Sequence, residues 1–103
     1  MIKPDKYVFP AVFTYEDGYE IAVTFPDLPG CATSGETEGN ALEMAKDVLG
    51  GHLWCLENDG DEIPSPSKLC DLELGDNERS VLIEIYIPSI RLSKENHTVA
   101  LLG

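Results

Sequence analysis

The chain has 103 residues, of which 43% are hydrophobic, and its formal net charge is −12. This length suits one compact domain, and the apolar fraction is too high for a disordered chain. No apolar run approaches the roughly 20 residues that span a bilayer, and the first six residues lack a signal-peptide core. We therefore expect a cytoplasmic protein.

The negative charge is unevenly distributed along the chain. Between Tyr7 and Ser67 the only basic side chain is Lys46, whereas twelve side chains in that stretch are acidic. Such a surface repels nucleic-acid phosphates, and it raises the rate of encounter with a basic partner. The alternative is an acidic surface that only keeps the protein in solution, and net charge alone leaves both interpretations open.

The cysteines do not form a recognisable motif. Cys31, Cys55 and Cys70 are widely spaced and include no C-x-x-C pair, so neither a zinc site nor a redox motif is predicted. We expect reduced and mostly buried thiols.

The first predicted elements are two strands, residues 6–15 and 19–25, in which hydrophobic residues recur with a period of two. Between them, Glu16-Asp17-Gly18 is typical of a hairpin turn. Pro10 has no amide hydrogen, so we expect the first strand to lie at a sheet edge or to turn its proline outward. In the second strand the residues expected on the buried face are Tyr19, Ile21, Val23 and Phe25.

A proline- and glycine-rich loop follows at residues 26–30, and residues 31–35 are compatible with a short third strand. Thr37 is a suitable N-cap for a helix that runs to about Asn58 and stops at Asp59-Gly60. Gly50-Gly51 inside this helix indicates a close approach to the sheet or a local kink. The apolar stripe of the helix consists of Ala41, Leu42, Ala45, Val48, Leu49, Leu53 and Leu56.

The remaining chain holds one strong strand signal. Residues 59–80 are rich in turn formers and predict a loop with little regular structure, whereas residues 80–87 alternate as a strand does. Residues 88–95 are polar and turn-like, and 98–102 could form a last short strand. The predicted order is β-β-β-α-β, an α+β fold with a mainly antiparallel sheet and one long helix on one face.

Several runs in this frame resemble the HicB antitoxin family. They are Gly18-Tyr19, Phe25-Pro26-Asp27-Leu28-Pro29-Gly30-Cys31, Thr33-Ser34-Gly35-Glu36-Thr37, and Ala41-Leu42 with Ala45. Asp59-Gly60 and Ile63-Pro64-Ser65-Pro66-Ser67 are similar to a later segment of the family. Gly39-Asn40 departs from it, because an acidic residue more usually precedes the Ala-Leu pair. The resemblance covers roughly residues 7–90.

The resemblance implies a partial RNase H-like fold and a role as an antitoxin. Such a protein binds HicA, a small basic toxin that cleaves mRNA, and covers the toxin's histidine-containing active site. It implies homodimers or homotetramers, and in many members a C-terminal module that binds operator DNA. We expect residues 1–90 to form the antitoxin domain and residues 91–103 to be a tail leading toward such a module. No basic strand or recognition helix of that kind is present in this sequence.

Two groups of residues are candidates for the site. Acidic residues and one tryptophan are predicted to contact the partner: Glu16, Asp17, Glu20, Asp27, Glu36 and Trp54. The family-like residues are expected to be mainly structural: Phe25, Pro26, Leu28, Pro29, Gly30, Cys31, Gly35, Thr37, Ala41 and Leu42. No cofactor and no metal are predicted.

Two rival functions stay open. An RNase H-like scaffold can hold carboxylates around Mg²⁺, and Glu20 with Glu84 is the best pair that this sequence offers for a metal-dependent nuclease. A repressor that binds operator DNA is the other rival, in a longer form of the protein. His52 lies in the predicted helix without an evident nucleophile beside it, so we do not predict a general base there.

Overall fold

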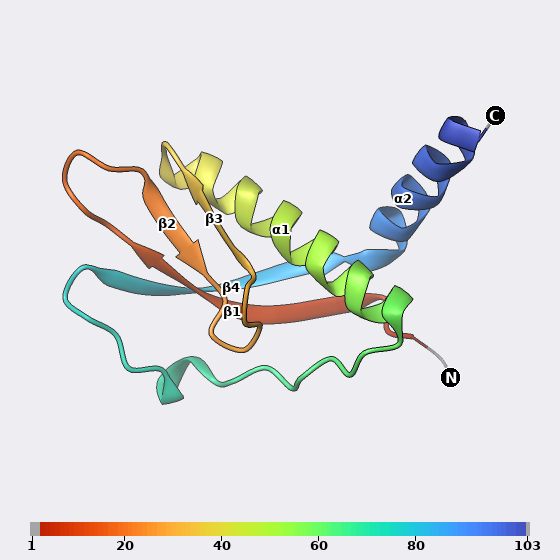
Figure 1. The fold of residues 1–103 in the computed structure, drawn as a ribbon. Coiled ribbons are helices and arrows are strands. Elements are labelled where there is room, and N and C mark those ends of the chain that lie inside the picture. Colours follow the sequence, from red (N-terminus) through yellow and green to blue (C-terminus); the bar gives the residue numbers. More distant parts are fainter. Residues whose placement is uncertain (1–2, 103) are drawn as a thin grey trace.

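The protein folds as an antiparallel sheet with a long helix against one face and a second helix at its C-terminal end (Figure 1). This computed structural model describes residues 3–102. Residues 1–2 of the predicted antitoxin domain and residue 103 of the predicted tail lie outside the described residues. The strand order is β3-β2-β1-β4. The elements are β1 (Lys6–Thr14), β2 (Ile21–Thr24), β3 (Ala32–Gly35), α1 (Glu38–Asp59), the 3₁₀-helix η1 (Leu69–Asp71), β4 (Glu78–Tyr86) and α2 (Ile87–Leu102). The predicted α+β class and β-β-β-α-β order are confirmed.

The core lies between α1 and the sheet. Phe9, Ala11 and Phe13 of β1 face the helix, with partners from β2 and β4 that alternate in the same way. Of the apolar stripe predicted for α1, four residues are fully buried: Ala41, Ala45, Leu49 and Leu53. Two predicted core residues are instead exposed: Tyr19 precedes β2 in the hairpin, and Leu42 lies at the margin of the stripe.

The position of β1 differs from the prediction. It is a central strand, paired with β2 on one side and β4 on the other, and Pro10 is buried. The reason is the short β2, which pairs with β1 only from Val12 to Thr14. At Pro10 the strand has one paired neighbour, Leu82 of β4. A missing amide hydrogen is therefore tolerated there, as it is at a sheet edge.

The bounds of α1 agree with the sequence signals. The Thr37 Oγ1 atom accepts a hydrogen bond from the Asn40 amide at 3.0 Å, and the Asn40 side chain accepts one from the Glu36 amide at 3.0 Å. The first bond satisfies an amide that the first helical turn leaves unpaired, and the second ties Glu36, which precedes the N-cap, to that turn. At the other end Gly60 has φ of 73° and closes the helix in the left-handed conformation.

The C-terminal segment corrects the prediction. Residues 88–95 are not a turn and 98–102 are not a strand, because α2 is helical from Ile87 to Leu102. Pro88 lies in its first turn, where a missing amide hydrogen costs nothing. Gly50 of α1 allows the close packing, because a Cβ there would clash with the Ile90 side chain. The glycine therefore serves an approach to α2 and not, as predicted, to the sheet.

A partly buried ion pair fixes the start of α2. Arg91 donates to both carboxylate oxygens of Glu57, at 2.8 and 2.6 Å, and to the Pro4 carbonyl at 3.1 Å. The Tyr7 hydroxyl donates to the same carboxylate at 2.8 Å. The hydrogen bond from Arg91 holds the pKa of Glu57 below its usual value, and burial together with Glu57 raises the pKa of Tyr7 to about 12. This cluster joins β1, α1 and α2.

The segment between α1 and β4 crosses the sheet on the side away from α1 (Figure 1). It is mostly irregular, as predicted, apart from the short η1. Ile63 packs against the core. Ser67 donates from its amide and hydroxyl to the two carboxylate oxygens of Asp27, at 2.8 and 2.5 Å. These bonds attach the segment to the loop that follows β2.

Candidate functional site

Acidic side chains gather at one end of the sheet. The β1–β2 hairpin, the turn between β3 and α1 and the start of β4 all lie at this end, which is at the left in Figure 1. The strand registers explain the grouping, because Thr14 pairs with both Ala22 and Glu78, and Ile21 pairs with Gly35. We call this surface the acidic end. Its carboxylates are those of Glu16, Asp17, Glu20, Glu36, Glu38, Asp76 and Glu78.

Hydrogen bonds hold these segments together. The Tyr15 amide donates to the Asn77 carbonyl at 2.9 Å, and the Asn77 side chain donates back to the Tyr15 carbonyl at 3.1 Å. The Ser34 hydroxyl donates to Glu20 at 2.7 Å. Burial and the neighbouring Glu38 carboxylate raise the pKa of the Tyr15 hydroxyl, so it stays neutral. The acidic end is therefore an ordered surface made from three separate parts of the chain.

Four of the six residues predicted to contact a partner lie at the acidic end: Glu16, Asp17, Glu20 and Glu36. Asp27 lies elsewhere, and both of its carboxylate oxygens accept hydrogen bonds from Ser67. Trp54 is half-buried on α1, and the Lys94 Nζ atom lies 5.8 Å from its ring centroid. Asp27 and Trp54 thus have structural contacts of their own.

Three members of the acidic end are additional to the predicted set: Glu38, Asp76 and Glu78. Asp76 and Glu78 are distant in sequence from the hairpin, and only the pairing of β1 with β4 brings them beside it. The sequence carried no signal for that register. For Glu38 a signal was present, since it directly follows the helix N-cap and a helix N-terminus favours acidic residues.

The run from Phe25 to Cys31 forms a closed loop. The Phe25 amide donates to the Cys31 carbonyl at 3.2 Å. The Leu28 amide donates to the Phe25 carbonyl, and the Leu28 carbonyl accepts from the Cys31 amide, at 3.0 Å each. Gly30 has φ of 85°, which a residue with a side chain rarely adopts. The side chains of Phe25, Leu28 and Cys31 are buried in the core, whereas Pro26 and Pro29 are exposed.

The thiols differ in their surroundings. Cys31 is buried, and burial raises the pKa of its thiol to about 11. Cys55 and Cys70 are exposed, so the prediction that most of the thiols are buried is wrong. Cys55 lies on the solvent side of α1, and Cys70 lies in η1, which the sequence did not predict.

The carboxylates considered for metal chemistry do not converge. Glu20 precedes β2 and accepts from Ser34, whereas Glu84 lies on β4 and pairs with Lys6 at 3.4 Å. β1 runs between β2 and β4. Within residues that the structure describes, no three His, Cys, Asp or Glu side chains are arranged to hold a metal ion. Also within that part of the chain, no helix has the length and apolar character needed to cross a membrane.

Similar solved structures share this fold. A chain of a toxin–antitoxin complex from Streptococcus pneumoniae superposes with a TM-score of 0.75 at 27% identity, covering 82% of this chain and 72% of that chain. The N-terminal domain of the Burkholderia pseudomallei antitoxin HicB superposes with a TM-score of 0.65 at 25% identity, covering 77% of this chain and 98% of that domain.

Curated relatives and a family model agree with the structural comparison. Antitoxin HicB 2 of Photorhabdus laumondii is 40% identical over 60 residues, 57% of this chain and 42% of that protein. Antitoxin HicB 1 of the same organism is 32% identical over 78 residues, 72% of this chain and 49% of that protein. The matches thus span less than half of these two relatives. Residues 9–100 match the model of the HicB-like antitoxins. Because that match covers most of its length, this chain belongs to the HicB-like antitoxin family of bacterial toxin–antitoxin systems.

Proposed function

We propose that this chain binds a small basic toxin of the HicA type and neutralises it by covering its active site. The observation that carries the proposal is the acidic end, where seven carboxylates from three segments share one ordered surface. A concentrated negative field attracts a basic protein and orients it during encounter. Membership of an antitoxin family supports the same conclusion.

Two of the similar solved structures also fit this proposal. One is the toxin–antitoxin complex from Streptococcus pneumoniae, and the other, which shows the fold alone at 23% identity, is a complex of HicA3 with HicB3. We infer a binding role without catalysis and a location in the cytoplasm. The separation of Glu20 from Glu84 gives the rival nuclease function no support.

Operator binding stays a prediction for a longer form that carries a C-terminal module. The division into a domain of residues 1–90 and a tail of residues 91–103 also stays a prediction. In this structure α2 is continuous across residue 90.

The test is the association rate of the toxin with two charge-reversal variants. We expect Glu16→Lys with Asp17→Lys to slow association about tenfold at low ionic strength, because both charges lie at the tip of the acidic end. The difference should shrink at about 0.15 M salt, where screening acts over roughly 8 Å. Stopped-flow mixing with the purified toxin measures both rates.

The matched control is Asp59→Lys with Asp61→Lys, which changes the net charge equally at the C-terminal end of α1. We expect a smaller effect from this pair. Equal slowing by the two double variants would show that only net charge matters and would remove the acidic end from the proposal.

A further inference from the structure

The first half of β1 has an open edge on the side of β2. In an antiparallel pair, alternate residues direct their backbone N–H and C=O groups to opposite sides of the strand. The Ile87 amide donates to the Asp5 carbonyl and the Tyr15 amide donates to the Asn77 carbonyl, so the odd-numbered residues of β1 bond to β4. The even-numbered residues face the other side, where β2 reaches only as far as Val12. The earlier even-numbered residues therefore face no strand.

The open groups are main-chain donors and acceptors. They are the N–H and C=O of Lys6, the N–H and C=O of Val8, and the C=O of Pro10, whose nitrogen carries no hydrogen. Among the residues that the structure describes, none forms a hydrogen bond with these groups. A partner that satisfies such a row must have extended backbone, because an extended chain repeats its own N–H and C=O groups at the same spacing.

A hollow of about 490 Å³ lies along this open edge. It is bordered by Pro4 and residues 6–9 on one side and by residues 63–66, in the segment after α1, on the other. Residues of both faces of β1 line it, with Phe9 from the face toward α1 and Val8 from the opposite face. The hollow therefore follows the edge of the strand, and we call it the β1 groove.

The outer wall of the β1 groove is attached at both ends and is poorly suited to pair with β1 itself. Pro64 and Pro66 carry no amide hydrogen, so the wall has few donors to offer. Ile63 packs against the core, and Ser67 donates twice to Asp27. The edge of β1 between these two attachments stays available to another chain.

The charge at one end of the β1 groove is negative. A second hollow, of about 640 Å³, continues the groove past Pro4, Tyr7 and Ile63, which line both. Its charged lining residues are Lys3, Glu57, Asp61 and Glu62. Glu57 is already paired with Arg91, so two carboxylates remain beside one ammonium group. In a chain with a net charge of −12, this end favours a basic group.

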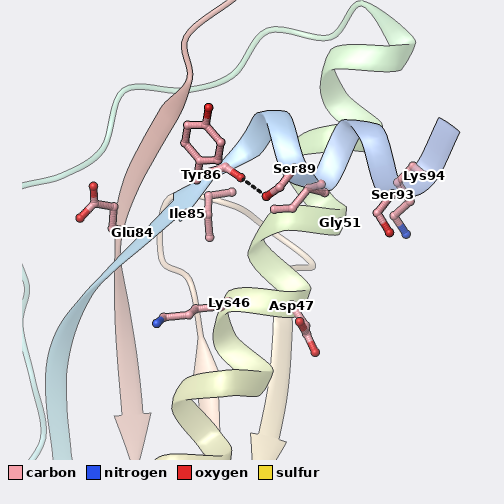
Figure 2. A pocket seen from close by; sticks show the side chains of 10 residues that line it. Lys46, Asp47, Gly51, Glu84, Ile85, Tyr86, Ser89, Ser93 and Lys94 are labelled. Carbon is pink, nitrogen blue, oxygen red and sulfur yellow. Dashed lines mark hydrogen bonds between the residues drawn. The ribbon is translucent and has the colours of Figure 1, made fainter. Parts of the chain in front are cut away.

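The hollow at the C-terminal end of β4 has a different character. Figure 2 shows its charged side chains, which are Lys46, Asp47, Glu84 and Lys94. Two positive and two negative charges leave no net charge for a ligand to recognise. The Tyr86 carbonyl accepts a hydrogen bond from the Ser89 hydroxyl at 3.0 Å, so it is not open to an added strand. The β1 groove, in contrast, combines open backbone groups with a net charge at one end.

We propose that the β1 groove binds an extended peptide that has apolar residues and a basic C-terminal end. Both neighbours of β1 are antiparallel to it, so the peptide continues the line of β2 in the same direction. Its alternate residues bond to Pro10, Val8 and Lys6 in turn, as in strand addition to a sheet edge. Its C-terminal end then reaches the second hollow, beside Asp61 and Glu62. This inference does not rest on the proposed function.

The first test separates main-chain from side-chain recognition. The probe is a fluorescent hexapeptide of alternating threonine and valine that ends in two lysines, and anisotropy should give a dissociation constant below about 1 mM. Val8→Pro should raise this constant at least about tenfold, because it removes a donor and places its ring where the peptide lies. Pro10 shows that the fold accepts proline on this edge. Val8→Ala keeps the amide and is the matched control, with a change of less than about threefold.

The second test changes only the peptide. In an extended strand every second amide faces β1, so N-methylation of the third and of the fourth residue should have unequal effects. One methylated peptide should lose at least about tenfold in affinity, and the other should lose less than about threefold.

The third test concerns the basic end of the peptide. Asp61→Asn with Glu62→Gln should weaken binding about threefold, because both carboxylates lie at the end that receives the lysines. Glu16→Gln with Asp17→Asn removes the same charge at the acidic end and should have a smaller effect.

Four results would overturn the proposal. They are no binding at about 1 mM peptide, equal affinities of Val8→Pro and Val8→Ala, equal affinities of the two methylated peptides, and equal effects of the two charge-neutralised pairs, which would remove the basic end. If Val8→Pro fails to fold by circular dichroism, the methylated peptides decide the question, because they need no variant of the protein.

Discussion

At the scale of single residues, Gly35 is a position where a side chain has no room. A Cβ at this position would clash with the backbone of Ala41, where β3 ends and α1 begins. We expect Gly35→Ala to lower the free energy of unfolding by about 1–3 kcal/mol, because backbone atoms cannot move aside as a flexible side chain can. Urea unfolding followed by circular dichroism measures the change.

Gly39→Ala is the control for this substitution. A Cβ at Gly39 has nothing within 4 Å, and the residue is helical. Its replacement should leave stability unchanged or raise it by up to about 1 kcal/mol. Similar losses at the two positions would mean that β3 and α1 do not approach as described.

The three cysteines offer a second prediction at this scale. Cys31 is buried with a thiol pKa of about 11, whereas Cys55 and Cys70 are exposed. A thiol reagent at about pH 8 should therefore modify two thiols quickly and the third only on unfolding, because the thiolate is the reactive form. Rapid reaction of all three thiols in the folded chain would contradict the burial of Cys31.

The loop from Phe25 to Cys31 was predictable from the sequence, because proline and glycine have characteristic backbone preferences. The need for a glycine at position 35 was not predictable from the sequence, because it depends on the distance between β3 and α1. Asp27 shows the same limit: its bonds to Ser67 join residues 40 positions apart.

At the scale of elements, the Tyr7–Glu57–Arg91 cluster holds α2 against α1 and β1. The pKa of Glu57 is lowered in the folded state, so its contribution is complete above its unfolded value of about 4.5 and is lost as the pH falls through the folded value. The pKa of Tyr7 is raised to about 12, so its contribution is complete below 10.0 and is lost as the pH rises through about 12. The cluster therefore stabilises the fold most between these limits.

We expect Glu57→Gln to lower the free energy of unfolding by about 1–3 kcal/mol at neutral pH and by less in acid. Glu84→Gln removes a carboxylate from an exposed pair with Lys6 and should cost about 1 kcal/mol or less. Urea unfolding across the acid range compares the two variants. Equal losses with equal pH dependence would show that the cluster adds nothing beyond a surface ion pair.

The strands were predictable because one face of each is buried, which imposes a period of two. α2 was not predictable in this way. Its first turns follow β4 directly, and its packing depends on Ile90 against Gly50 and on Arg91 against Glu57. These contacts involve residues of α1 more than thirty positions away, so the local sequence appeared only polar.

At the scale of the whole molecule, two surfaces of different character lie on one small fold. The acidic end is highly charged, whereas the later part of β4 carries the exposed apolar side chains Leu82 and Tyr86. Four of the acidic positions were predicted from the uneven charge of the sequence. The exposure of Leu82 and Tyr86 was not predicted, because it follows from the strand order, in which β4 is last.

The proposed function predicts neutralisation at a defined stoichiometry. Because the chain is proposed to cover the toxin's active site, added antitoxin should stop RNA cleavage in proportion to the complex formed. The most direct measurement titrates this chain into a fixed amount of a purified HicA-type toxin and follows cleavage of a labelled mRNA. We predict a linear fall in cleavage that ends when the two chains are equimolar, and full cleavage in the presence of excess folded chain would contradict the account.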